Sequence, residues 1–214
     1  MQRLKVTPEN TAAVAARAAL LVASGGVVLH PTDTVYGLAC DATHAVAVAR
    51  VMRMKQRPQG VPFIVLVESM DAAEPWLASL SPAHREIIDR CRRAGAVTFV
   101  LRSSALARSH IVGCGETLAV RIPDDPFCHA LCGFAAVPVL STSANLHGQP
   151  VPTSIEETDP MLCERADMVI DAGVRTGLPS TILEIVDEFP RVLREGGVTC
   201  AALEHLLLPD FPLK

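Results

Sequence analysis

The chain has 214 residues, of which 50% are hydrophobic and 20% are charged, and its formal net charge is −4. This length suits one domain that buries roughly 70% of the surface of its unfolded chain. No apolar run reaches the roughly 18 to 20 residues of a membrane span, and the N-terminal residues lack the apolar core of a signal peptide, so we expect a cytoplasmic protein. The negative charge argues against a surface coated in positive charge for nucleic acid, so any RNA contact is expected to be local.

The seven cysteines are odd in number and scattered along the chain, which argues against a disulfide framework. Cys128 and Cys132 lie beside His129, but no second pair of ligands follows at the spacing of a zinc finger. The histidines also lack the H-E-x-x-H spacing of a zinc enzyme. We therefore predict reduced thiols and no metal site built from side chains.

The first third of the chain predicts two helices, each followed by a strand. Residues 11–23 are rich in alanine and leucine and end before Gly25, which is typical of a helix with a C-terminal glycine. Residues 45–55 predict a second helix, with Thr43 as its N-cap. The two strands are predicted from the apolar runs 27–30 and 63–67.

The rest of the chain continues this alternation. A helix is predicted to begin at Pro82, after Ser81, and to end near Arg93. Ser154 and Glu157 form an S-x-x-E capping box that predicts the start of another helix. Further helices are predicted over 126–134 and 200–208, and strands over 97–102, 118–122, 137–140, 168–171, 181–186 and 192–194. Because some links are too short for a helical crossover, we predict an α/β domain with a large mixed sheet.

A polar run, 31–38, directly follows the apolar segment 27–29 and is the most informative feature of the chain. Pro31 cannot donate to a sheet ladder, and the residues after it present short side chains that form hydrogen bonds. The run predicts a grip on a polar ligand at the edge of a sheet. The alternative is a strand followed by a plain Asx-type turn.

Lys55, Arg57 and Arg194 are candidate ligands of phosphate, because an ammonium acts as a point charge and a guanidinium as a fork with two donors. The alternative for the first two is a solvated cationic end of a helix. The sequence contains neither G-x-x-x-x-G-K-[ST] nor G-x-G-x-x-G, so a nucleotide would have to be held without a P-loop or a Rossmann turn.

Two further features are polar residues that follow or interrupt apolar runs. Residues 141–145 place three hydroxyls and an amide after a predicted strand, either as donors to phosphate or ribose or as a Ser/Thr turn. Arg121 interrupts the run 118–122, so it lies on a solvent face or in a cleft where it meets a carboxylate. No G-x-S-x-G elbow or other nucleophile set is present, so covalent catalysis is not indicated.

Six segments, in this order along the chain, resemble the YrdC-type threonylcarbamoyl-AMP synthase family: 31–38, 55–58, 117–123, 141–145, 180–182 and 193–196. The resemblance implies a single YrdC-like catalytic domain over 1–214, of the short bacterial type, with a twisted mixed sheet around an open cleft. It implies a nucleotidyltransferase that makes threonylcarbamoyl-AMP and pyrophosphate from L-threonine, bicarbonate and ATP with Mg2+. The product would feed the threonylcarbamoyladenosine modification of tRNA through downstream transfer proteins.

The resemblance also implies roles for individual residues. Positions that bind L-threonine in the family correspond to Thr34, Arg121, Ser141 and Ser180. Positions that bind ATP correspond to Lys55, Arg57, Thr117, Ser143, Asn145 and Arg194, and the first two are the candidate catalytic residues. Such residues would position the substrates and screen the charge of the leaving pyrophosphate, so no nucleophile is needed.

The chain departs from the family after the basic segment, where Val61 and Leu66 stand at positions that are polar in many members. Two rival functions therefore stay open. One is a paralogue without turnover or with an altered substrate, which binds nucleotide or double-stranded RNA or tRNA through the basic segment 50–57. The other is a related chemistry in which carbamoyl phosphate is the donor, as in the YrdC-like part of hydrogenase maturation proteins.

Overall fold

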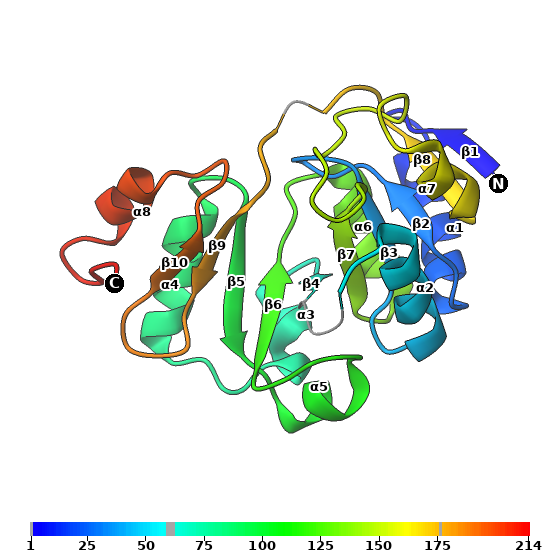
Figure 1. The fold of residues 1–214 in the computed structure, drawn as a ribbon. Helices are drawn as coiled ribbons and strands as arrows, with labels where there is room; N and C mark the ends of the chain where they lie inside the picture. Colours follow the sequence, from blue (N-terminus) through cyan, green and yellow to red (C-terminus); the bar gives the residue numbers. More distant parts are fainter. Residues whose placement is uncertain (1, 59–62, 176) are drawn as a thin grey trace.

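The computed structural model describes residues 2–58, 63–175 and 177–214. In this part of the chain ten strands form one sheet, in the order β1-β8-β2-β3-β7-β4-β6-β5-β9-β10 (Figure 1). The strands are β1 (Gln2–Lys5), β2 (Val28–His30), β3 (Gly37–Asp41), β4 (Ile64–Leu66), β5 (Val97–Arg102), β6 (Thr117–Arg121), β7 (Val139–Ser143), β8 (Met168–Asp171), β9 (Thr181–Glu184) and β10 (Arg191–Arg194). The sheet combines parallel pairs, such as β4 with β6, and antiparallel pairs, such as β3 with β7, which confirms the predicted mixed sheet.

Helices cover both faces of the sheet. They are α1 (Thr11–Ala23), α2 (Ala45–Lys55), α3 (Met70–Ala73), α4 (Pro82–Arg92), α5 (Ala105–His110), α6 (Pro126–Ala135), α7 (Pro160–Arg165) and α8 (Cys200–Leu207). Alternate residues of β2 divide between two hydrophobic clusters: Val28 packs in a cluster with α1 and α6, and Leu29 packs in one with α2 and α7. This period of two is the alternation of a strand with both faces covered. None of these helices is long and apolar enough to cross a membrane.

Two predictions of local structure are wrong. The N-cap of α2 is His44, whose Nδ1 accepts from the backbone N–H of Ala47, while the Thr43 hydroxyl donates to the Asp41 carboxylate. The predicted capping box forms its first hydrogen bond, from the N–H of Glu157 to Ser154 Oγ at 3.2 Å, but only turns follow.

The proline at position 160 explains why no helix follows the capping box. Pro160 has no N–H and disfavours helical backbone at Asp159, so a helix begun near Ser154 would break after one turn. The chain instead starts again at Pro160, with Asp159 as the N-cap of α7. The carboxylate of Glu157 turns back and accepts from the N–H and the hydroxyl of Thr153, at 2.8 Å each.

The central hairpin brings the polar segments of the sequence to one place. Strand β3 was not predicted; it follows the polar run and pairs with β2, with Gly37 opposite His30. On its other side β3 pairs with β7, which extends to Ser143 instead of ending at the predicted Leu140. The hydroxyls of 141–143 therefore stand on a strand beside the 31–36 loop.

Candidate active site

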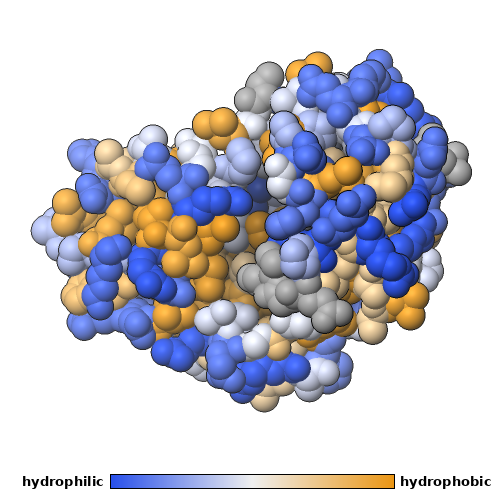
Figure 2. All heavy atoms as spheres, viewed as in Figure 1, coloured by the Kyte–Doolittle hydropathy of each residue, from blue (hydrophilic) through white to orange (hydrophobic). Residues whose placement is uncertain are grey.

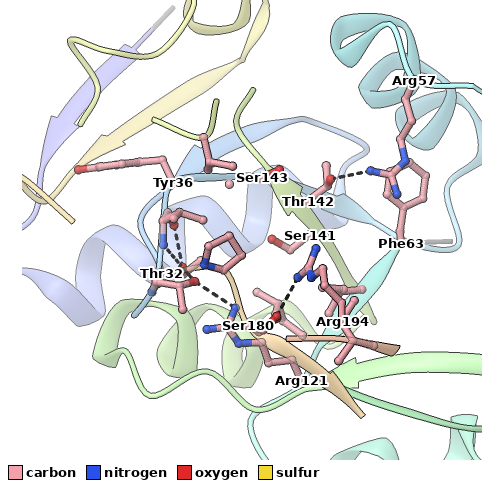
Figure 3. Close-up of a pocket in the computed structure, with 18 residues that line it drawn as sticks. Thr32, Tyr36, Arg57, Phe63, Arg121, Ser141, Thr142, Ser143, Ser180 and Arg194 are labelled. Carbon is pink, nitrogen blue, oxygen red and sulfur yellow. Dashed lines mark hydrogen bonds between the residues drawn. The ribbon is translucent and has the colours of Figure 1, made fainter. Parts of the chain in front are cut away.

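A cleft of about 190 Å³ lies where these polar segments meet, and its walls come from stretches far apart in the chain (Figure 3). Three arginines face it: Arg57 after α2, Arg121 at the end of β6 and Arg194 at the end of β10. No carboxylate is among the described residues that line it. The cleft is therefore electropositive, although the chain as a whole is acidic. Beside it, apolar side chains gather over β9 and β10 (Figure 2), among them Leu193, which is 46% exposed.

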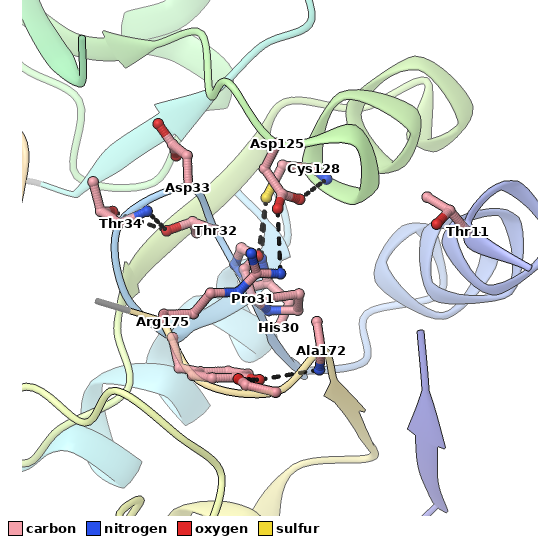
Figure 4. Close-up of polar contacts among 12 residues, drawn as sticks. Thr11, His30, Pro31, Thr32, Asp33, Thr34, Asp125, Cys128, Ala172 and Arg175 are labelled. Carbon is pink, nitrogen blue, oxygen red and sulfur yellow. Dashed lines mark hydrogen bonds and ion pairs between the residues drawn. The ribbon is translucent and has the colours of Figure 1, made fainter. Parts of the chain in front are cut away.

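Thr32 shapes the loop on one side of the cleft (Figure 4). Its Oγ1 accepts from the N–H groups of Thr34 and Val35, at 3.1 Å each, and donates to the carbonyl of Val35 at 2.7 Å. The Thr32 hydroxyl also lies 2.9 Å from that of Thr34, and either oxygen can be the donor in this contact. Thr32 thus fixes the loop that brings Thr34 to the cleft wall.

Arg121 is the buried cation that the interrupted strand predicts. Its Nη1 donates to Thr34 Oγ1 at 3.1 Å, and its Nη2 donates to the carboxylate of Asp33 at 2.6 Å. The Arg121 side chain is 7% exposed and that of Asp33 is 13% exposed, so this is a buried ion pair. The structure thus places Arg121 in a cleft in contact with a carboxylate, as the second alternative for this residue predicts.

Arg57 and Arg194 approach the cleft from opposite sides. Gln56 ends α2 in the left-handed conformation, with φ 50°, and the chain turns there toward the cleft. The guanidinium of Arg57 then lies 4.7 Å from the centre of the Phe63 ring and donates to Thr142 Oγ1 at 3.3 Å. The guanidinium of Arg194 donates to the carbonyl of Ser180 at 2.8 Å. Burial lowers the pKa of both arginines, and the charge of Arg121 lowers that of Arg194 further.

Lys55 lies behind the cleft, although the sequence predicts it on a phosphate. Its ammonium donates to the carbonyls of Ser143 and Asn145 and to Asn145 Oδ1, the last two at 2.7 and 3.0 Å. The residue is 1% exposed, and burial together with the charge of Arg57 lowers the pKa of Lys55 to about 8. In this structure the ammonium holds the loop that follows β7, and direct contact with ATP stays a prediction.

The other predicted residues divide into two groups. Ser141, Ser143 and Ser180 line the cleft with Thr34, so the structure brings these hydroxyls together. Asn145 lies outside the lining, and its Oδ1 accepts from the Ser143 hydroxyl at 2.6 Å. Thr117 stands at the opposite end of β6 from Arg121, beside a separate cavity of about 30 Å³. The structure does not bring Thr117 to the cleft, so its predicted contact with ATP is a prediction only.

Sequence reasoning missed Phe63 as a residue of the site, whereas Thr142 lines the cleft as one of the hydroxyls expected in 141–145. Phe63 was assigned to a strand, but it precedes β4 and supports the Arg57 guanidinium. An aromatic residue close in sequence to a cluster of cations is the signal that could have found it. Leu66, one of the two departures from the family pattern noted in the sequence, lines the cleft as an apolar side chain. Val61, the other departure, lies outside the described residues.

Comparison with known proteins gives a consistent family. The family model Sua5_yciO_yrdC, described as "Telomere recombination", matches residues 21–196. Threonylcarbamoyl-AMP synthase of Bacillus subtilis is 35% identical over 196 residues, which are 91% of this chain and 56% of that protein. The enzyme of the same name from Xanthomonas euvesicatoria is 37% identical over 157 residues, which are 72% of this chain and 83% of that one.

Two solved structures share the fold over most of the chain. Pyrococcus abyssi Sua5 complexed with L-threonine has a TM-score of 0.85 and 27% identity, covering 100% of this chain and 62% of that one. Escherichia coli YciO has a TM-score of 0.82 and 25% identity, covering 94% and 98%. The chain therefore spans little more than half the length of the Bacillus relative and nearly all of YciO. On the match of the family model and these relatives, the chain belongs to the Sua5/YciO/YrdC family.

Proposed function

We propose that the chain is an L-threonylcarbamoyl-AMP synthase, which joins L-threonine, bicarbonate and ATP into threonylcarbamoyl-AMP and pyrophosphate. The observation that carries this proposal is the cleft itself, where three arginines surround a set of hydroxyls and none of the described lining residues carries a carboxylate. Such a site suits an amino acid together with the phosphates of a nucleotide. The relatives named threonylcarbamoyl-AMP synthase and the Pyrococcus structure with L-threonine support the same reaction.

We assign the amino acid to Arg121 and the hydroxyls of Thr34, Ser141 and Ser180, which all line the cleft. In our mechanism the guanidinium of Arg121 receives the carboxylate of L-threonine, and the hydroxyl oxygens receive its amine. The amine reacts with bicarbonate to give a carbamate and water. An oxygen of the carbamate then attacks the α-phosphorus of ATP, and the bond to pyrophosphate breaks.

We assign the phosphates of ATP to Arg57 and Arg194, which both line the cleft. Their charges would screen the pyrophosphate as it leaves, while the walls hold the carbamate in line with the α-phosphorus. Mg2+ would enter with ATP as part of the substrate, because phosphate oxygens supply its ligands. The described residues contain no group of three His, Cys, Asp or Glu side chains placed to hold a metal ion.

The rival function as an RNA-binding module would need the cations of the basic segment, of which Arg53 is exposed but Arg50 is bound within the protein. Arg50 donates to both carboxylate oxygens of Asp167, at 2.6 and 3.0 Å, and to the carbonyl of Arg165. Its donors are thus used within the protein. We further propose that the adenylate passes to cytoplasmic proteins that transfer the threonylcarbamoyl group to tRNA.

Pyrophosphate release tests the proposed function. The purified chain is expected to release pyrophosphate from ATP and Mg2+ only when both L-threonine and bicarbonate are present, with little release when L-serine replaces L-threonine. Arg92→Ala, a surface change in an arginine paired with Asp89, should leave the rate unchanged. Release that does not need bicarbonate would contradict the reaction, and nucleotide binding without release would favour the paralogue.

A further inference from the structure

His30 is a fully buried side chain at the end of β2, directly behind the cleft. Its Nδ1 lies 2.9 Å from the carbonyl of Pro31, and its Nε2 lies 3.1 Å from Ser141 Oγ. The thiol of Cys128 donates to the same carbonyl at 3.1 Å (Figure 4). The ring is thus held between a carbonyl on one side and a cleft hydroxyl on the other.

The hydrogen-bond partners fix the tautomer of His30. A carbonyl can only accept, so Nδ1 carries the hydrogen. Burial, with a smaller contribution from the charge of Arg121, lowers the pKa of His30 to about 4, so the ring is neutral near pH 7. Its Nε2 then carries a lone pair, to which the Ser141 hydroxyl donates. The single hydrogen of Ser141 is therefore turned away from the cleft.

The contact between the imidazole and Ser141 depends on Gly37. A Cβ atom at this position would lie 3.0 Å from Nε2 of His30, 3.1 Å from Oγ of Ser141 and 3.2 Å from the carbonyl of Thr142. Gly37 lies opposite His30 in the β2–β3 pair and opposite Ser143 in the β3–β7 pair. Three strands thus converge on a contact that a larger residue would crowd.

We propose that His30 is a positioning residue that makes Ser141 a hydrogen-bond acceptor for the amino group of the amino-acid substrate; this rests on the proposed function. Thr34 Oγ1 lines the same cleft and accepts from Arg121 Nη1 at 3.1 Å, so a cation and hydroxyl oxygens stand together there. An α-amino acid matches both ends of this arrangement, because its carboxylate accepts from the guanidinium and its ammonium donates to the hydroxyls.

A double-mutant cycle by calorimetric titration with L-threonine tests this role. His30→Leu and Ser141→Ala should each weaken the binding of L-threonine by about tenfold. Each variant removes the Ser141 oxygen, or its orientation, as the acceptor for the ammonium of L-threonine. The double variant should bind no more weakly than Ser141→Ala alone. His30→Gln, whose side-chain oxygen can accept from Ser141, should recover most of the affinity, and ATP affinity should not change. Losses that multiply in the double variant would overturn the role.

A second measurement needs no change at His30. In the native chain labelled with 15N, the ring nitrogens of His30 should report the hydrogen on Nδ1 at pH 7, and Ser141→Ala should move the Nε2 resonance but not that of Nδ1. A hydrogen on Nε2 would overturn the inference. If the native chain binds no L-threonine, the proposed function fails and the inference falls with it. If it binds and the cycle is additive, only the inference fails.

Discussion

Arg121→Ala is expected to weaken the binding of L-threonine by about 100-fold, because it removes two charge-assisted donors from the carboxylate. ATP affinity is expected to change by no more than about twofold, since Arg57 and Arg194 are untouched. The variant also leaves Asp33 as a buried carboxylate without its cation, which should lower the free energy of unfolding by about 3 to 5 kcal/mol. Calorimetric titration with each ligand and denaturation by urea measure the two effects.

A matched variant separates binding from stability. Asp33→Asn removes the carboxylate that occupies Arg121 and keeps the guanidinium. It should also destabilise the chain, but it should retain or strengthen the binding of L-threonine, because the cation then lacks an internal competitor. Equal losses of L-threonine and ATP in Arg121→Ala would contradict the division of the cleft into an amino-acid end and a phosphate end.

Lys55→Met is expected to lower the free energy of unfolding by about 2 to 4 kcal/mol, because it leaves the carbonyls of Ser143 and Asn145 without their donor. ATP binding should weaken as well, because Ser143 lines the cleft and would lose the contact that holds its backbone in place. Urea denaturation and ATP titration measure both quantities. Lys5→Met, a loss of the same charge at an exposed site, is the control.

The comparison between the two effects identifies what Lys55 does. If Lys55→Met abolishes ATP binding while the free energy of unfolding stays unchanged, the ammonium binds phosphate directly and does not anchor the loop. If the free energy of unfolding falls and the binding of ATP weakens without being abolished, the anchoring role explains both effects. The second result is the one that the observed contacts predict.

Local patterns predicted the regular elements well. The helices over 11–23 and 45–55 have the predicted bounds, because each carries an apolar stripe that stops where the backbone turns left-handed. Gly25 suits that conformation in the first, and Gln56 adopts it in the second. The capping box at Ser154 failed because the signal is local, whereas the proline at 160 acts several residues later. Strand β3 was missed because it begins at Gly37, within the polar run 31–38, which has the composition of a loop.

The site was predictable as a set of polar segments but not as a geometry. Arg121 could be found because a charge within an apolar strand needs a partner, and Asp33 was already part of the polar run. Pairings between distant strands decide the rest of the geometry. They set where the Lys55 ammonium points, which end of β6 holds Thr117, and that the His30 ring lies behind Ser141. No spacing within one segment encodes those pairings.

The central claim is that the cleft joins an amino acid, one carbon from bicarbonate and AMP. The most direct measurement is mass spectrometry of the nucleotide products formed within seconds from ATP, Mg2+, L-threonine and 13C-bicarbonate. The account predicts an adenylate that carries threonine and one 13C atom, formed in step with pyrophosphate. A threonine adenylate without 13C, or pyrophosphate with no adenylate of either kind, would contradict it.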